Sequence, residues 1–422
     1  MPRITLRGRD CRGPILALAI LATGCGPADR SSVDRTSVMR DSAGVAIITN
    51  EGPVAPGSWT IADEPELVIG AEGDRSAQTF FQVRGVARVG SGITAVLDGG
   101  SSELRYFDET GELVGVAGGS GDGPGEFRNV TAIVDDRADS LVVFDQWAGR
   151  LSVFAPDGGF VRSRSLTEAW GVGLGWNVLG TSPDGRLVLG GPLVEPPPPG
   201  FGPDTTGFPV YLAQEGAEAP DSLGTVPSNI SASDLQGRPR PVLPNPVLSS
   251  PVVADSGIWA SVPMRPELML VGWDGSVERV VRFTGESRML GTDEVERIAS
   301  WYRDRIAAVP EAARSQMSEV AILPRLPDFA ALLVDDFGHL WVQEARNDRD
   351  PELWQLAAPS GGSRWRVFDE EGVWLTTVEV DPGFQPFSVD GDWVSGVWKG
   401  PLDEEEVRVY RLARAQLVSF SR

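Results

Sequence analysis

The sequence predicts an all-β protein made of six similar sheets arranged in a ring. Short alternating strands, each followed by an Asp-Gly or Glu-Thr-Gly turn, recur along most of the chain, and β-branched and aromatic residues fill them. The two clearest copies, 93–111 and 141–158, align at a period of about 47 residues, within the range that marks propellers and solenoids. The fold class we expect is therefore a six-bladed β-propeller.

Four weaker copies follow the first two and retain the turn and the aromatic or β-branched strand. They lie at 184–189, 255–275, 335–372 and 390–410. Without its insertions the chain offers about 50 residues per unit for six units and about 44 for seven, and both lengths suit a blade. The six counted copies favour six blades over seven. Since a ring must also close without leaving a free edge, we expect the strand at 44–50 to pair with the C-terminal strand around 408–412.

Two insertions interrupt the repeats. The first, 195–209, contains four consecutive prolines, which favour a stiff surface loop. The second, 292–323, starts with Thr292 as a helix N-cap before an acidic first turn. Its apolar residues recur at helical spacing, and Pro310 interrupts them. This pattern predicts a helical hairpin whose apolar stripe covers one end of the ring.

The first 24 residues have the pattern of an export signal. Four arginines precede an apolar run at 14–22 that is too short to cross a bilayer, and Thr23 and Gly24 are small residues before Cys25. The segment resembles bacterial lipoprotein signals, in which the cysteine after the cleavage point carries a diacylglycerol. That resemblance implies lipid attachment at Cys25, although Ala22 replaces the usual leucine. An ordinary secretory signal is the alternative.

The signal defines the predicted domains and the compartment. Residues 25–42 are rich in Ser, Asp and Arg and predict a flexible, lipidated tether, so the propeller would occupy 43–422. Membrane contact would come through the lipid anchor, outside the cytoplasm. Gly26 stands where an aspartate resembles a signal for retention at the inner membrane, so we expect the outer membrane.

The charge balance excludes several partners. The formal net charge is −22, and removal of the signal would bring it to about −25. A surface of that sign repels phosphate backbones and anionic headgroups, so we expect no nucleic acid partner. We also expect a monomer.

Cysteine and histidine usage narrows the possible chemistry. Of the two cysteines, Cys11 would leave with the signal and Cys25 would be acylated, so the mature fold would have no disulfide. His339 is the sole histidine, so a Ser-His-Asp triad would have to use it and a multi-histidine metal site is impossible. We expect His339 to be structural and no cofactor to be needed, with oxygen-ligated calcium as the open alternative.

One glycine-rich segment carries a family resemblance. The segment 119–127, GSGDGPGEF, resembles the inter-blade junction of NHL-repeat propellers, and Asp145 with the strand RLSVF at 150–154 resembles the aspartate and strand of that repeat. The first copy departs by having Glu103 in place of the arginine. Two further stretches, 41–45 and 324–335, resemble bacterial lipoproteins catalogued as six-bladed β-propellers. The resemblance implies the fold but no single activity, because propellers host binding, scaffolding and catalysis.

Several residues are candidates for a site. Glu126 and Arg128 lie at the end of the junction and are candidates to line a ligand site, although a structural role is favoured for both. Asp98 and Asp145 occupy equivalent positions in two copies. They would accept backbone hydrogen bonds in their own blades or converge on the channel to hold calcium, and their repetition favours the first.

The tryptophans fall mostly in or beside strands and are expected to pack between blades, Trp147 among them. Trp170 and Trp176 lie in a glycine-rich run, and we expect them to be exposed and to stack on sugar or peptide.

Two functions from different classes follow. The first is a cell-envelope module that binds or scaffolds a protein, peptide or glycan. The second is a calcium-dependent hydrolase or lyase resembling gluconolactonase-type or peptidyl-hydroxyglycine lyase-type propellers. No Glu-Asn-Asp set is identifiable and one histidine does not suit the lyase, so the sequence favours the first function and leaves catalysis open.

Overall fold

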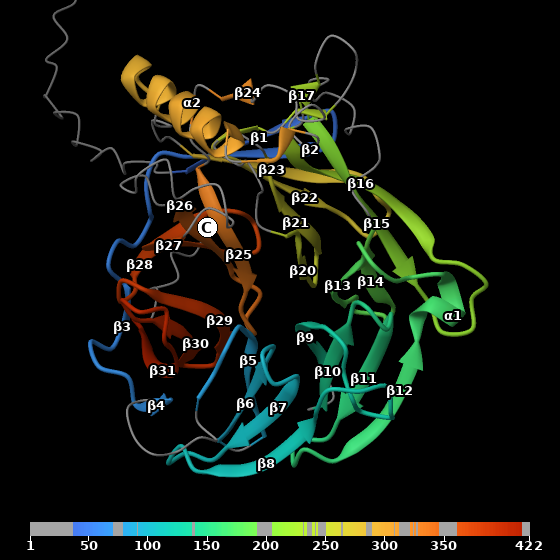
Figure 1. Ribbon diagram of the computed structural model, residues 1–422. Coiled ribbons are helices and arrows are strands. Elements are labelled where there is room, and N and C mark those ends of the chain that lie inside the picture. The colour runs from blue at the N-terminus through green and yellow to red at the C-terminus, as the bar shows by residue number, and fades with distance from the viewer. Residues whose placement is uncertain are drawn as a thin grey trace, which may run out of the picture. The chain divides into compact units, whose positions relative to one another are not determined.

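The computed structural model is a ring of six blades around a central axis, which confirms the predicted β-propeller (Figure 1). The innermost strands β5, β9, β13, β20, β25 and β29 surround the axis. The structure describes residues 37–415 except 71–78, 91, 137–139, 192–204, 231, 234–238, 241, 244–249, 263–264, 284–288, 308, 312–320, 324, 326–327 and 346–360.

The first three blades are antiparallel four-stranded sheets that follow the chain from the axis outward. Blade 1 comprises β5 (Val83–Val89), β6 (Ile93–Asp98), β7 (Glu103–Phe107) and β8 (Leu113–Gly118). Blade 2 comprises β9 (Val130–Asp136), β10 (Ser140–Asp145), β11 (Arg150–Phe154) and β12 (Phe160–Ser165). Blade 3 comprises β13 (Asn177–Thr181), β14 (Leu187–Gly190), β15 (Thr205–Ala213) and β16 (Asp221–Ile230).

Of the last three blades, the fourth and the sixth also include strands from near the N-terminus of the chain. Blade 4 comprises β20 (Val252–Ala254), β21 (Gly257–Ser261), β22 (Glu267–Val271) and β23 (Val277–Phe283), followed by β2 (Val45–Asn50) and β1 (Ser37–Ser42). Blade 5 comprises β25 (Phe329–Val334), β26 (Leu340–Ala345), β27 (Gly361–Phe368) and β28 (Trp374–Glu379). Blade 6 comprises β29 (Phe384–Asp390), β30 (Trp393–Lys399) and β31 (Glu405–Arg414), with β3 (Trp59–Ile61) and β4 (Leu67–Ile69) paired to β31.

The core lies between neighbouring blades. Tyr106 of blade 1 packs in one cluster with Phe127 and Phe154, which lie before and within blade 2. Trp259, Trp341 and Trp365 are almost completely buried, as expected for tryptophans that pack between blades. Each sheet therefore buries both faces against its two neighbours, which suits the near-continuous apolar runs of the second and third strands.

The ring closes through strands other than the predicted one. The strand at 44–50 does not pair with the C-terminal strand; β2 pairs in parallel with β23, where Ile48 is buried in a cluster with Val281. Closure comes instead from β3 and β4, which run antiparallel to β31. Trp59 of β3 packs with Tyr410 and Leu412 of β31, so this short aromatic segment fits the last blade's core.

Two boundaries differ from those expected. Residues Ser37–Ser42, predicted as the end of the tether, form β1 because they pair with β2. The insertion at 195–209 ends early, since β15 already begins at Thr205. The start of the tether, with Cys25, lies outside the described residues.

The helical insertion is confirmed in its first half. The first helix is α2 (Thr292–Ala307), in which Ile298 is buried. The second predicted helix falls mostly on 312–320, outside the described residues, and the chain continues as β24 (Ala321–Ile322), paired with β19 (Val242–Leu243). The remaining short elements are α1 (Leu166–Trp170), β17 (Ala232–Ser233) and β18 (Pro239–Arg240). No helix of the described residues has the length and apolar character needed to cross a membrane.

Candidate ligand-binding face

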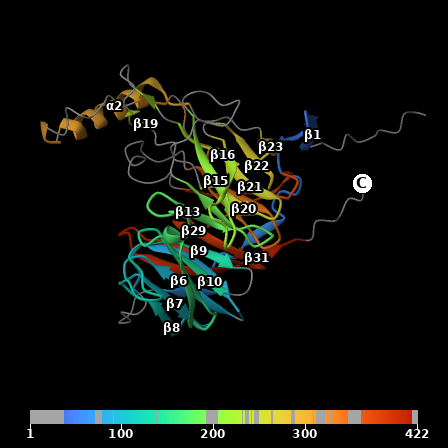
Figure 2. The same cartoon turned by 90° about the vertical axis from the view of Figure 1, so that its right-hand side faces the viewer.

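The two faces of the ring carry different kinds of connection. Because neighbouring strands in a blade are antiparallel, the loops after the second strands and the connections between blades emerge together, on what we call the loop face. It includes 79–82, 99–102, 119–129, 146–149 and 166–176, and also α2. The other face, which we call the turn face, carries short turns such as 108–112 and 155–159. In Figure 2, α2 projects from one side of the ring and the C-terminal end of β31 lies toward the other.

Asp145 holds two segments of the loop face together. It is fully buried at the end of β10, where its carboxylate accepts hydrogen bonds from the backbone N–H groups of Arg128 at 2.6 Å and Asn129 at 3.2 Å. It also accepts bonds from Trp147 at 3.1 Å and Ala148 at 3.0 Å. One carboxylate thus fixes the incoming connection of blade 2 against the next loop of the same blade.

Asp98 makes the equivalent arrangement in blade 1. Its carboxylate accepts backbone hydrogen bonds from Phe81 at 3.2 Å and Gly100 at 3.1 Å, and Arg105 lies 3.3 Å away in an ion pair. Phe81 therefore corresponds to Arg128, and Gly100 to Trp147. The backbone role that the sequence predicted for these aspartates is what their contacts show.

The two aspartates are not brought together. They lie in different blades, and each is engaged within its own. Within the described part of the chain, no three His, Cys, Asp or Glu side chains are grouped closely enough to hold a metal ion. Calcium binding by Asp98 and Asp145 thus stays a prediction that their placement does not support.

Glu126 and Arg128 differ in their availability. The Glu126 carboxylate accepts a hydrogen bond from the Gly123 backbone N–H at 2.7 Å and so braces the glycine-rich loop from inside. Arg150 braces the same loop by donating to the backbone carbonyls of Asp122 and Glu126. Arg128 projects outward, 53% exposed, in an ion pair with Asp122. Of the two, Arg128 is therefore the one whose side chain is exposed.

Trp170 and Trp176 are less exposed than predicted. Trp170 donates its indole N–H to the Ala217 carbonyl at 3.0 Å, and the Arg164 guanidinium covers its ring at 4.2 Å. Trp176 packs against Tyr211, with 5.2 Å between ring centroids. Both rings are half-buried against blades 2 and 3 because these contacts occupy their faces.

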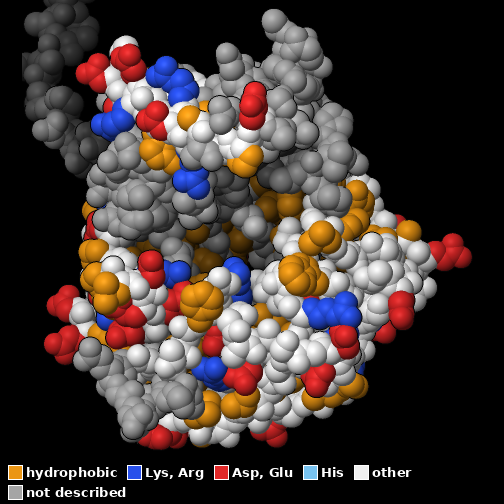
Figure 3. Space-filling model, in the orientation of Figure 1, with side chains coloured by type: hydrophobic (Ala, Val, Ile, Leu, Met, Phe, Trp, Pro, Cys, Tyr) orange, Lys and Arg blue, Asp and Glu red, His pale blue; other side chains and the backbone are white. Residues whose placement is uncertain are grey.

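Two of the exposed apolar residues of the loop face are ones that the sequence did not single out as binding candidates. Trp147, expected between blades, is 62% exposed, and Leu174 is 76% exposed. The Gln146 side chain donates to the Trp176 carbonyl at 2.8 Å and so ties the loop of Trp147 to the turn of Leu174. The sequence contained one signal for the exposure of Trp147, which is its place in the four-residue loop that follows Asp145. Figure 3, which views the loop face, shows hydrophobic and charged side chains around a hollow centre.

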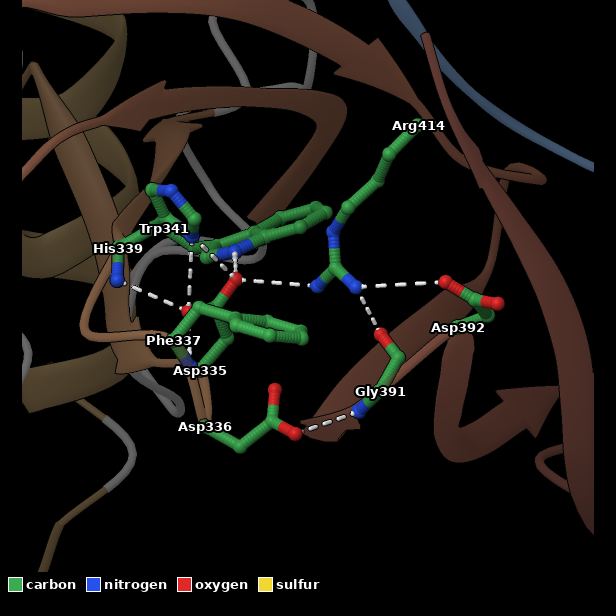
Figure 4. A network of polar contacts seen from close by, with 8 residues as sticks. All are labelled: Asp335, Asp336, Phe337, His339, Trp341, Gly391, Asp392 and Arg414. Atoms are coloured by element: carbon green, nitrogen blue, oxygen red, sulfur yellow. Dashed lines mark hydrogen bonds and ion pairs between the residues drawn. The ribbon is translucent and has the colours of Figure 1, made fainter. Parts of the chain in front are cut away.

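The sole histidine belongs to a structural network on the turn face (Figure 4). His339 Nδ1 lies 3.0 Å from the Asp335 carboxylate, and the Trp59 ring meets the imidazole edge to face at 4.9 Å. No described serine or threonine hydroxyl lies within hydrogen-bonding distance of the ring, so the contacts do not form a Ser-His-Asp triad.

Asp335 is the centre of that network. Its side chain is fully buried and also accepts hydrogen bonds from Trp341 Nε1 at 3.1 Å and Arg414 at 3.2 Å. Burial works to raise the pKa of Asp335, but the hydrogen bonds and charge of His339, with Trp341, hold that pKa below its ordinary value. Because Asp335 belongs to blade 5 and Arg414 to the end of β31, the network joins the last two blades at the point of closure.

Comparison with known proteins finds only distant structural similarity. No family model matches the chain, and no curated protein matches it. A protein from Bacteroides fragilis described as exported aligns with 86% of this chain and 99% of its own at 14% identity and a TM-score of 0.46. A gluconolactonase from Xanthomonas campestris aligns with 83% and 99% at 13% identity and 0.41. A virginiamycin B lyase from Staphylococcus aureus aligns with 84% and 99% at 8% identity and 0.39. Such distant matches identify neither a ligand nor a reaction.

Proposed function

We propose that this chain is a lipid-anchored, envelope-located binding module that recognises a protein, peptide or glycan through its loop face. The observation that carries the proposal is the exposure of Trp147 and Leu174 on loops held by buried hydrogen bonds. Trp and Arg are the residue types that most often dominate binding interfaces, and Arg128 stands beside Trp147 on the shared Asp145 carboxylate.

The rigidity of these loops supports binding in a second way. A side chain that is already held in place loses little conformational freedom when a partner covers it. Asp145, Arg150 and Gln146 together fix the three segments that present Arg128, Trp147 and Leu174. The loop backbones that carry these side chains are therefore preorganised, which favours affinity without any rearrangement of the loops.

We expect Trp147→Ser to weaken ligand binding by at least tenfold, since central aromatic anchors cost about 2 kcal/mol or more when truncated. The measurement is recovery of a partner from solubilised envelope by the immobilised chain, followed by titration of the purified partner. Phe337→Ser is the matched control, because Phe337 is a similarly exposed aromatic on the turn face, at 57% against 62%. Equal losses in both variants would contradict a role for the loop face, and so would failure of the wild type to recover any partner.

Lipid attachment is proposed for Cys25, with the outer membrane as the expected site. We expect the wild-type chain to sediment with membranes and Cys25→Ala to appear in the soluble fraction, because the acidic surface offers no attraction to anionic headgroups. Immunoblots of fractionated cells, with density-gradient separation of the two membranes, provide the measurement. Continued membrane association of Cys25→Ala would overturn the proposed anchor.

A further inference from the structure

The outer edges of the blades are protected against strand addition, with one exception. A free edge presents unpaired backbone N–H and C=O groups to any other strand, and proteins guard such edges with charge, proline, short length or a covering segment. β1 carries Arg40 and Asp41, and β12 carries Arg162 and Arg164. The outer strand of blade 3, β16, contains Asp221 and Pro227.

The outer edges of blades 5 and 6 are protected by a covering segment and by short strands, respectively. Segment 54–55 covers β28, where Val54 N–H donates to the Trp374 carbonyl at 2.9 Å. In blade 6 the strands added to β31 are only three residues long. Each of these five blades therefore has an edge that resists pairing with another chain.

β8 of blade 1 has none of these features. Its sequence, LVGVAG, contains no charged residue and no proline, and its hydrogen-bonded neighbour in the sheet is β7 alone. Val114 and Val116 are 57% and 51% exposed, and they project on the same side because side chains alternate along a strand. Figures 1 and 2 place β8 on the rim, with no further strand of the described residues outside it.

In place of the monomer expected from the sequence, we propose that β8 is a homodimer interface, in which β8 of a second copy adds antiparallel to it. In an antiparallel pair, hydrogen-bonded and non-hydrogen-bonded positions alternate, so a two-fold axis must place one residue opposite its own copy. With Gly115 at the axis, Val114 faces Val116 of the second copy and Val116 faces Val114. This register buries both exposed valines on each chain against valines and unites the two blades into one continuous sheet.

The sequence of β8 explains why a second copy of this chain fits the edge better than a strand of another protein. The strand is nearly symmetric about Gly115, with valine on either side, so one segment supplies both halves of a matched set of cross-strand pairs. The opposing factor is the net charge of −22 on each chain. That repulsion is screened over about 8 Å at physiological ionic strength, so dimerisation should strengthen as salt is added.

The first test measures mass. We expect sedimentation velocity of the purified chain to show a concentration-dependent dimer that Val116→Arg removes. Val161→Arg is the control, since Val161 on β12 is 56% exposed in a strand that already carries arginines. A monomer at all concentrations up to about 100 μM, a range in which weak interfaces populate, would overturn the proposal. Equal loss of the dimer in the control variant would do so too.

The second test measures register. In chains whose native cysteines are replaced by serine, Val114→Cys and Val116→Cys should each fail to cross-link alone and form a disulfide-linked dimer when the two variants are mixed. Opposed residues lie about 4.5 to 5.5 Å apart between Cα atoms, within disulfide reach, whereas diagonal ones lie about 7 to 8 Å apart. Cross-linking by either variant alone, or none from the mixture, would show that this register is wrong.

Discussion

Asp145→Ala is expected to lower the free energy of unfolding by about 4 kcal/mol, the largest single effect at the loop face. The substitution leaves four backbone N–H groups without their acceptor in a fully buried place. Hydrogen bonds to a charged group contribute about 1.5 to 3 kcal/mol each, and a buried donor without a partner carries its desolvation cost. The measurement is equilibrium unfolding in urea, compared between variant and wild type.

Two further variants test whether the loss of stability comes from removing a buried carboxylate or from removing any aspartate. Asp145→Asn retains one oxygen but turns an N–H₂ group toward the Arg128 N–H, so about half of the loss is expected. Asp108→Ala is the matched control, because Asp108 accepts similar backbone bonds from Thr110 and Glu112 in an exposed turn, and should change stability little. If Asp108→Ala were as damaging as Asp145→Ala, burial would not be the cause.

The same variant connects the fold to the proposed function. Asp145 touches no ligand, yet it positions the backbones of both Arg128 and Trp147. Loss of this carboxylate should therefore weaken binding even in chains that remain folded. Asp145 thus serves both the fold and the proposed binding face. Because an aspartate recurs at the equivalent place in another blade, the sequence pattern identified Asp145. Nothing in that pattern showed that Asp145 positions Trp147.

The sequence predicted the blades because their signals are local. Turn, strand and aspartate recur within each unit, so the six copies could be counted directly. One departure from the repeat is resolved by strand geometry: Glu103 replaces the expected arginine, but Arg105 lies two residues further on. Side chains two apart in a strand share a face, so Arg105 still reaches Asp98 at 3.3 Å and the Thr79 carbonyl at 2.9 Å.

The sequence could not predict how distant segments pair. The strand at 44–50 and the short strands at 59–61 and 67–69 all carry suitable apolar residues, and pairing partners depend on which neighbouring core each one fits. The exposure of Trp147 and the open edge of β8 depend likewise on which segments cover them in space. A tryptophan beside a strand has the same local sequence whether its ring is buried or faces solvent.

Closure of the ring provides the second large effect, which depends on pH. Asp335→Asn is expected to lower the free energy of unfolding by about 3 kcal/mol at pH 7. It removes the charge that Arg414 and His339 contact, and breaking a buried charge network by changing one member is strongly destabilising. The folded-state pKa of Asp335 lies below its unfolded value, which for aspartate is about 3.9. Its ionised form therefore stabilises the fold above that unfolded value, and the contribution is lost as pH falls through the folded pKa.

The difference between wild type and Asp335→Asn should thus shrink as the pH falls from about 5 toward 2. Urea unfolding across this range is the measurement. Asp392→Asn supplies the control, because Asp392 contacts the same Arg414 from a position that is 54% exposed, at 3.6 Å, and exposed pairs contribute less than about 1 kcal/mol. A difference for Asp335→Asn that stayed as large at pH 2.5 as at pH 7 would mean that another property of the side chain, such as its shape, holds blades 5 and 6 together. The shrinking difference is expected because a protonated Asp335 still fits between Trp341 and Arg414 but no longer offers them a charge.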